Sequence, residues 1–259
     1  MKYITIIILF FSNLVFSQKG IVEYGYIEAF SIGNAKGPDY NAYMIFNKSE
    51  SYYVTAKDSL ETPVKTNTKT TFNNDDSSIG TVYNNMKVSE IGDQVLYNIH
   101  KDSIWSNFLY RKQIYVEEIA PKINWKIEKE TKKIGKLTCK KATTHFRGRN
   151  YSAWFTTDIP LPFGPWKLNG LPGLILEVYD TNKNVYWYFK RIEYPTENKE
   201  TIKKKSIYLK ENMLTYSDLK DFQKEEQDIV TERGMVLKKQ FPEIEVIKPS
   251  LSEMFIECE

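Results

Sequence analysis

The stretch Gly164-Pro-Trp-Lys-Leu-Asn-Gly-Leu-Pro-Gly-Leu-Ile-Leu-Glu-Val-Tyr-Asp180 decides how the rest of the chain is expected to fold. Four prolines and three glycines fall within residues 160–173. Because proline fixes φ and removes a backbone donor, this segment cannot run as a continuous helix or a central strand. Its many apolar side chains predict a segment that is pinned against a core or lines a pocket. After Gly173 the apolar alternation from Leu174 to Tyr179 predicts a strand.

Residues 170–175, Gly-Leu-Pro-Gly-Leu-Ile, also carry a resemblance, to the hexapeptide for which the GLPGLI family of bacterial envelope proteins is named. Two flanking segments resemble the same family, Ile134-Gly-Lys-Leu-Thr-Cys-Lys-Lys-Ala142 and Gly148-Arg-Asn-Tyr-Ser-Ala-Trp-Phe-Thr-Thr-Asp-Ile-Pro160. The resemblance covers residues 124–195 and continues more weakly back to Gly20. It implies no activity, because the family is defined by sequence alone. The expected strand order resembles, more loosely, the half-barrel lipoprotein-carrier and sensor folds of the periplasm.

The N-terminus predicts export. A short basic start, an apolar run from Ile4 to Phe11 and a small residue before Gln18 are typical of a secretory signal peptide, with cleavage after Ser17. The alternative is a buried N-terminal strand. The apolar run is too short to span a membrane, and no later run is long enough. We therefore expect residues 1–17 to be removed and residues 18–259 to form a single β-rich domain in the periplasm or outside the cell.

Composition favours a β fold and excludes nucleic-acid binding. The chain has 259 residues, of which 18 are Tyr, 14 Phe and 5 Trp. Aromatic residues are enriched in strands, where one face of the pleated surface is buried. The formal net charge is +3, with acidic and basic residues interspersed, so no basic footprint for nucleic acid is present.

Short alternating segments separated by turn residues predict an antiparallel meander. The expected strands are Gly20–Phe30, Ala42–Phe46, Ser51–Thr55, Thr81–Val88, Gln94–Ile99, Ser103–Tyr110, Gln113–Glu118, Trp125–Glu130, Thr138–Phe146, Tyr151–Thr157 and Val185–Tyr194, besides the strand after Gly173. A polar insertion is expected near residues 57–78. The fold class is therefore mainly β (α+β), an antiparallel, strongly curved sheet or half-barrel.

The C-terminal part predicts a helical segment near residues 216–240. Thr215 and Asp218 have the spacing of a capping box, and this part has no proline before Pro242. We expect the helix to be interrupted near Gly234, to end before Pro242, and to close the open side or one end of the sheet.

The two cysteines, Cys139 and Cys258, leave two alternatives open. An oxidising compartment allows an even pair to form a disulfide. The other alternative is two free thiols, with Cys139 buried on a strand, because a residue so near the chain end is prone to fray.

Residue types with chemical potential are few. With only two histidines and no Cys-x-x-Cys pair, we expect no metal site, and no fingerprint for a cofactor is present. The hexapeptide Gly170, Leu171, Pro172, Gly173, Leu174 and Ile175 has no titratable side chain, so it cannot be a catalytic centre. Asp158, Glu177 and His145 are the candidates for acid–base chemistry, while Asp158 and Asp180 also suit strand ends and turns.

Two interpretations of the motif follow. In the architectural one, the crossing segment plugs the sheet and its apolar residues are core. In the functional one, it is the lip of an apolar pocket. The ligand-binding residues would then be Phe163, Trp166, Lys167, Leu168, Leu171 and Pro172. Arg147, Arg149 and Lys167 would meet an anionic head group at the rim, or would simply be solvated.

The function expected from these patterns is that of an exported, non-enzymatic envelope protein. It would bind an apolar or amphipathic ligand such as a lipid or peptide, or an outer-membrane protein, and would need no cofactor. One alternative is an envelope hydrolase, which requires titratable side chains that converge in a cleft. The other is a structural interaction module, which requires an exposed apolar patch and no cavity.

Overall fold

The computed structural model describes residues 19–30, 37, 39–55, 92–110, 112–196 and 213–259. Within these ranges the chain forms β1 (Gly20–Glu28), β2 (Asp39–Phe46), β3 (Glu50–Thr55), β4 (Gln94–Asn98), β5 (Ser103–Tyr110), β6 (Lys112–Ile119), β7 (Lys126–Ile134), β8 (Leu137–Phe146), β9 (Arg149–Thr156), β10 (Leu174–Asp180), β11 (Val185–Glu193), β12 (Met213–Leu214), α1 (Tyr216–Gln240) and α2 (Leu251–Met254). The predicted signal peptide, polar insertion and strand Thr81–Val88 lie outside the described residues.

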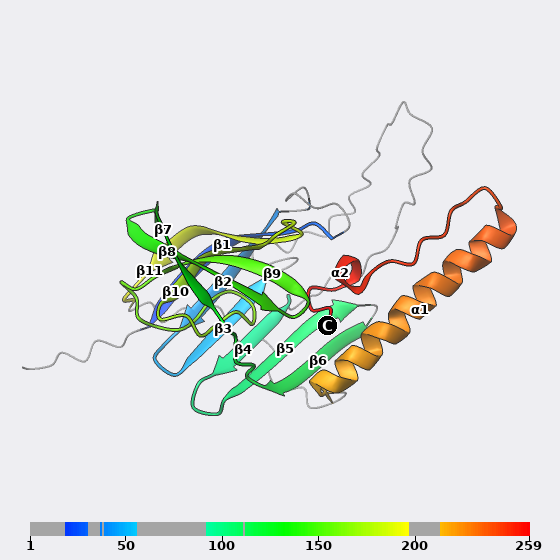
Figure 1. The fold of residues 1–259 in the computed structure, drawn as a ribbon. Helices are drawn as coiled ribbons and strands as arrows, with labels where there is room; N and C mark the ends of the chain where they lie inside the picture. Colours follow the sequence, from blue (N-terminus) through cyan, green and yellow to red (C-terminus); the bar gives the residue numbers. More distant parts are fainter. Residues whose placement is uncertain (1–18, 31–36, 38, 56–91, 111, 197–212) are drawn as a thin grey trace, which may run out of the picture.

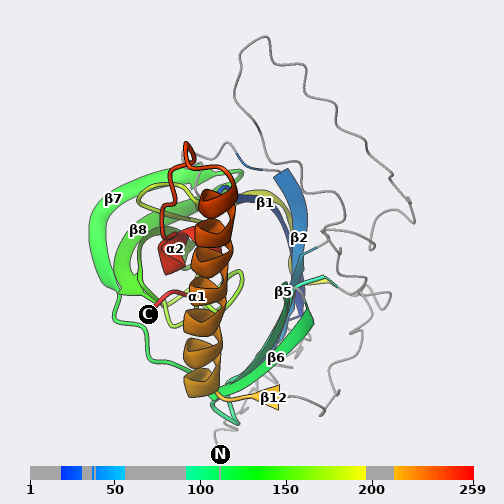
Figure 2. The ribbon, with the colours of Figure 1, turned by 90° about the vertical axis from the view of Figure 1, so that its right-hand side faces the viewer.

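The described strands form one sheet, in the order β12-β6-β5-β4-β3-β2-β1-β11-β10-β9-β8-β7. Neighbouring strands are antiparallel, except that β12 pairs with β6 in parallel. The sheet curves round on itself without closing, and Figure 2 shows it as an open arch with α1 across one end. A mainly β, strongly curved sheet with a C-terminal helix was predicted from the sequence and is confirmed (Figure 1).

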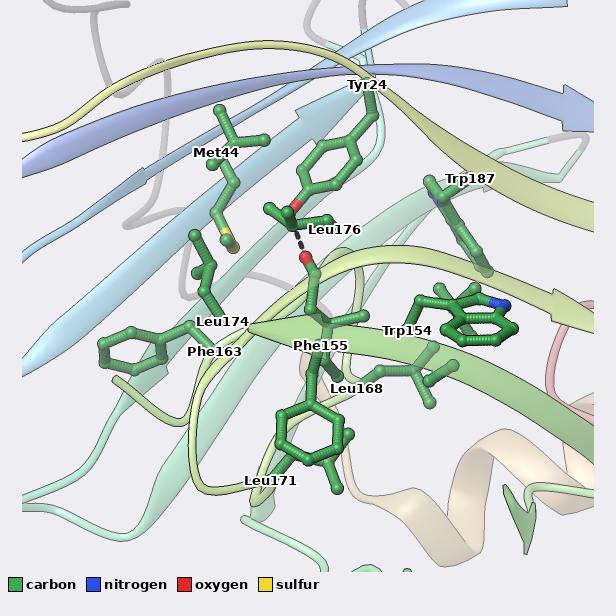
Figure 3. Packing of buried hydrophobic residues seen from close by; sticks show 14 of the residues in the cluster. Tyr24, Met44, Trp154, Phe155, Phe163, Leu168, Leu171, Leu174, Leu176 and Trp187 are labelled. Atoms are coloured by element: carbon green, nitrogen blue, oxygen red, sulfur yellow. Dashed lines mark hydrogen bonds between the residues drawn. The ribbon is translucent and has the colours of Figure 1, made fainter. Parts of the chain in front are cut away.

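Alternation on the strands places the core on the concave face. On β1, Val22, Tyr24 and Tyr26 are buried, while Ile21 and Glu23 are only half-buried. Figure 3 shows the result at the centre of the arch, where the Tyr24 hydroxyl donates a hydrogen bond of 2.7 Å to the Ile175 carbonyl. The core therefore joins β1 to β10 through a buried polar contact as well as through apolar packing.

The crossing segment, residues 157–173, is pinned inside the arch. Phe163 and Asn169 form an isolated antiparallel bridge, and the Leu174 amide donates to the Ile159 carbonyl at 3.1 Å. Gly173 has to be glycine, since a Cβ there would lie 2.0 Å from the Thr156 carbonyl oxygen. The segment is thus part of the core, as Figure 3 shows for Phe163.

The helix α1 begins with the predicted capping box, in which Thr215 and Asp218 bond each other's backbone amides. It ends at Gln240, before Pro242, as expected. The predicted interruption near Gly234 is wrong, because the helix runs through it. A Cβ on Gly234 would lie 2.9 Å from a Val246 methyl group, so the glycine serves close packing against the returning chain. No helix in the described ranges combines the length and the apolar character needed to cross a membrane.

After α1, the C-terminal segment (residues 241–259) returns to the arch (Figure 1). Arg149 at the start of β9 fixes it there, because the guanidinium donates to the carbonyls of Ser252, Phe255 and Ile256 at 2.5, 2.9 and 3.0 Å. Because all three carbonyls accept hydrogen bonds from this one side chain, Arg149 holds the C-terminal segment against the mouth of the arch.

Candidate functional site

A cavity of about 140 Å³ lies inside the arch, beneath the C-terminal segment. It is bounded by β1, β3, β4, β5 and β11, by the crossing segment, by α1 and by the C-terminal segment. Its lining residues are Tyr26, Glu28, Phe30, Tyr53, Thr55, Asp93, Val95, Ser106, Asn107, Phe108, Leu109, Tyr110, Trp166, Trp187, Gln223, Met254, Phe255, Ile256 and Glu257. The cavity combines aromatic rings with polar side chains, and we call it the arch pocket.

Strand register builds the aromatic wall of the arch pocket. Tyr26 and Trp187 are direct partners across β1 and β11, and their rings stack with centroids 5.1 Å apart. Trp166 from the crossing segment adds a third ring, 6.2 Å from Trp187 and nearly parallel to it. The Trp187 indole donates to the Tyr53 hydroxyl at 2.7 Å. Burial raises the pKa of Tyr26 and of Tyr53 well above the ordinary value, so both phenols stay protonated at neutral pH.

Two carboxylates, Glu28 and Asp93, line the same wall. The Tyr26 hydroxyl donates to Glu28 Oε2 at 3.0 Å, and the Asp93 amide donates to Thr55 Oγ1 at 2.9 Å. Burial is the main cause of the raised pKa of Tyr26, and the negative charges of Glu28 and Asp93 raise it further. Both carboxylates therefore lie near that ring. Among the described residues, no lysine, arginine or histidine lines the pocket.

A buried ionic cluster, formed by Glu118, Arg147, Lys167 and Glu257, lies next to the arch pocket. Lys167 Nζ lies 2.7 Å from Glu118 and 2.6 Å from Glu257. Arg147 pairs with Glu118, and its Nε lies 3.7 Å from Glu257 Oε2. None of the four side chains is more than 6% exposed. Burying a charge is costly unless it is paired, and here each charge faces the opposite sign. The cluster therefore joins β6, the β8–β9 turn, the crossing segment and the C-terminal segment.

The structure separates the predicted ligand-binding residues. Trp166 alone of the six lines the arch pocket. Phe163, Leu168 and Leu171 are buried in the core, and Pro172 is exposed. In the hexapeptide, Gly170 has a positive φ of 90°. Leu174 and Ile175 are the first two residues of β10 and are fully buried, so these residues build the fold.

The basic residues were placed wrongly by the sequence interpretation. Lys167, Arg147 and Arg149 do not line a rim for an anionic head group, since all three are buried. Lys167 and Arg147 belong to the ionic cluster, and Arg149 pairs with Asp180 at 3.1 Å. Their partners are distant in the sequence, which is why a local pattern suggested solvated bases.

The three candidates for acid–base chemistry do not share a site. His145 bonds Asn150 at 2.9 Å in the β8–β9 hairpin, and Glu177 pairs with Lys132 at 2.7 Å. The backbone amide of Asp158 bonds Thr156 after β9.

Both cysteines, Cys139 and Cys258, are free thiols. Of the two alternatives left open by the sequence, a disulfide or two free thiols, the structure has the two free thiols. Cys139 is buried on β8. Cys258 lies in the C-terminal segment, and its thiol donates to the carbonyl of Arg147 in the β8–β9 turn.

Residues of the arch pocket were missed because they come from eight separate parts of the chain. Glu28 had a readable signal, since it follows Tyr24 and Tyr26 at every second position of a strand and a carboxylate is unusual on an inward face. Asp93, Ser106 and Glu257 had none. In the described ranges, no group of three or more His, Cys, Asp or Glu side chains is arranged to hold a metal ion.

An open β-arch with a pocket lined by aromatic rings and carboxylates has the character of a binding or hydrolytic domain. Residues 108–244, more than half of the chain, match the family model described as N-glycanase peptide, N-terminal domain. The chain belongs to this family.

Two solved structures of PNGF-II are similar to this chain. The structure in the P21 space group has a TM-score of 0.52 and 15% identity, and covers 79% of this chain and 33% of that one. The structure in the C2 space group has a TM-score of 0.49 and 16% identity, and covers 79% and 32%. The first likeness shows the fold, and this chain spans about a third of the length of PNGF-II. No curated protein matches the chain.

These comparisons correct the predicted function. The expected non-enzymatic ligand carrier is contradicted, because the matching family is the N-terminal domain of N-glycanases, a class of hydrolases. The alternative of a hydrolase with an unrecognised site fits the family better.

Proposed function

We propose that this chain serves in the hydrolysis of N-linked glycans, with part of the glycoconjugate held in the arch pocket. The observation that carries the proposal is the family match of residues 108–244. The pocket supports it independently, because Glu28 and Asp93 lie beside the neutral phenols of Tyr26 and Tyr53 in a mostly enclosed cavity.

Hydrolysis of a C–N bond needs a base that takes a proton from water and an acid that protonates the leaving nitrogen. In the proposal Glu28 or Asp93 accepts the proton of the attacking water. The Tyr26 hydroxyl, which donates to Glu28 at 3.0 Å, orients that carboxylate. The proton then passes to the nitrogen as the C–N bond breaks, so the carboxylate returns to its starting state.

The proposal extends to the place of action and to the hexapeptide. Residues 1–17 have the pattern of a secretory signal peptide, so we place the protein in the periplasm or outside the cell, where glycoproteins are accessible. The resemblance of residues 124–195 to the GLPGLI family falls inside the matched residues 108–244, and we propose that both describe one β-arch.

The test is glycan release from an N-glycosylated peptide by the full chain, followed by mass spectrometry. Release should fall by a factor of about 10²–10⁴ in the variant that replaces the base, Glu28→Gln or Asp93→Asn. Glu130→Gln is the matched control. Glu130 lies on β7, its side chain is exposed, and it pairs with Lys141. Absence of release by the unaltered chain between pH 4 and 9, or equal release by all three variants, would refute the proposal.

A further inference from the structure

The end of α1 and the residues that follow it carry an exposed apolar surface. Among the described residues eight large apolar side chains are exposed, and six of them fall within residues 235–247. These six, which we call the apolar tip, are 41–75% exposed: Met235, Val236, Leu237, Phe241, Ile244 and Ile247. Scattered apolar residues are normal on a surface, but such a concentration marks an interaction site.

The apolar tip projects from the domain. The buried residues of α1, Leu219 and Gln223, both lie in its first two turns. Figure 1 shows the last turns of α1 clear of the sheet. Their support comes from the returning chain, where Val246 packs on Gly234 and Lys248 pairs with the exposed Asp228. Since most helical stability in proteins comes from packing of an apolar face, a further packing surface would stabilise this half of α1.

The exposed face of α1 at the tip is complementary to itself. Glu232, Met235, Val236 and Lys239 are all exposed, and their spacing of i, i+3, i+4 and i+7 places them on one side of the helix. An apolar centre is therefore flanked by an acid at one end and a base at the other. If two copies pack antiparallel about a two-fold axis between Met235 and Val236, each Lys239 faces Glu232 of the partner subunit. Such a two-fold contact uses the same surface on both copies.

The area of the tip also suits a second copy. At 41–75% exposure the six side chains present roughly 600 Å² per copy, since large side chains of this kind have on the order of 150–250 Å² each. A stable interface buries about 800 Å² per partner, with an apolar centre and a polar rim. The tip supplies such a centre, and the charged residues of α1 supply the rim. A lipid surface fits less well, because Glu243 and Glu245 alternate with the apolar residues of the tip.

We infer that the apolar tip is an interface between two copies of this chain, in which the ends of the two α1 helices pack antiparallel. Lys239 of each copy pairs with Glu232 of the partner subunit, and Met235 and Val236 of both copies form the apolar centre. The inference is independent of the proposed function, because no residue of the tip lines the arch pocket.

The experiment is sedimentation velocity of the full chain over about 5–500 µM, where a monomer–dimer equilibrium is expected. Glu232→Lys and Lys239→Glu each set like charges opposite one another twice in the dimer, so each should weaken association by at least about tenfold. An equimolar mixture of these two variants should associate about as well as the unaltered chain, because in a mixed dimer each introduced charge meets the opposite sign. Val236→Glu should weaken association by about a hundredfold or more, since it buries an unpaired charge.

Glu130→Lys is the matched control for a change of charge, because Glu130 is exposed on β7, at the opposite edge of the sheet from β12. It should leave the dimer unchanged. The substituted residues of α1 are all exposed, so dilute monomers of each variant should keep the urea midpoint of the unaltered chain.

Three results would overturn the interface: a monomer at every concentration, unchanged association of Val236→Glu, or a mixture of the two charge variants that associates no better than either alone. A monomer that binds phosphatidylglycerol vesicles, and loses this binding in Val236→Glu, would make the tip a membrane-binding surface and would also refute the dimer.

Discussion

Replacing Lys167 by methionine tests whether the ionic cluster holds the fold together. The Lys167 side chain is fully buried and pairs with both Glu118 and Glu257. Methionine keeps most of the volume but removes the charge, so two buried carboxylates are left to share Arg147. Removing one partner of a buried ion pair typically costs about 3–5 kcal/mol, because the remaining charge is uncompensated. We expect Lys167→Met to lower the free energy of unfolding by about this amount.

Urea unfolding followed by tryptophan fluorescence measures the loss directly. For a domain of this size about 3–5 kcal/mol corresponds to a fall in Tm of roughly 6–20 °C. Adding Glu257→Gln to Lys167→Met should recover part of the stability, because one unpaired carboxylate is removed. Lys141→Met is the matched control, since Lys141 pairs with the exposed Glu130 and its loss should barely move the midpoint.

The reasoning fails if Lys167→Met costs less than about 1 kcal/mol, the value of an ordinary surface pair. It also fails if the double variant is less stable than Lys167→Met alone. In either case the four charges would be solvated or neutral, and the C-terminal segment would be held by other contacts.

Three further predictions concern the core. Gly173→Ala should unfold the domain or make it insoluble, because its Cβ would lie 2.0 Å from the Thr156 carbonyl oxygen; a soluble variant with an unchanged urea midpoint would contradict this packing. Burial raises the pKa of Cys139 to about 11, so at pH 8 roughly one thiol in a thousand is ionised, and maleimide labelling traced by peptide mapping should reach Cys139 only after unfolding. Burial also raises the pKa of Tyr151. The folded state thus binds this proton more tightly, and its contribution to stability is complete below pH ~10 and lost as pH rises through the folded pKa. The phenolate absorbance that a Tyr151→Phe variant lacks should appear together with unfolding, whereas its smooth appearance near pH 10 in the folded protein would refute the burial.

The strands and the helix could be predicted because their signals are local. Alternation and turn residues gave the boundaries of β5, Ser103–Tyr110, without error, and the capping box gave the start of α1. The interruption near Gly234 was wrong because the reason for that glycine is Val246, which packs against it from the returning chain. A glycine that allows close packing and one that ends a helix look alike in a sequence.

The candidate site could not be predicted in the same way. Glu28 had a local signal, as a carboxylate in the inward register of β1. Glu257 had none, because its partner Lys167 lies 90 residues earlier in the chain. Arg149 and the carbonyls of the C-terminal segment are more than 100 residues apart, so a pair of bases at a hairpin turn looked solvated although both are buried. Long-range pairing of charges leaves no pattern in a single sequence.

The architectural and functional interpretations of the crossing segment meet at two adjacent residues. Trp166 has a positive φ of 55°, a conformation that costs a residue with a side chain roughly 1–2 kcal/mol. This turn of the backbone sends the indole to the arch pocket and the next side chain, Lys167, into the ionic cluster. Pinning by Gly173 and by the Phe163–Asn169 bridge holds the turn in place. The glycines and prolines thus carry no chemistry themselves. They fix Trp166, the residue of the crossing segment that lines the pocket, and Lys167, which pairs with Glu257.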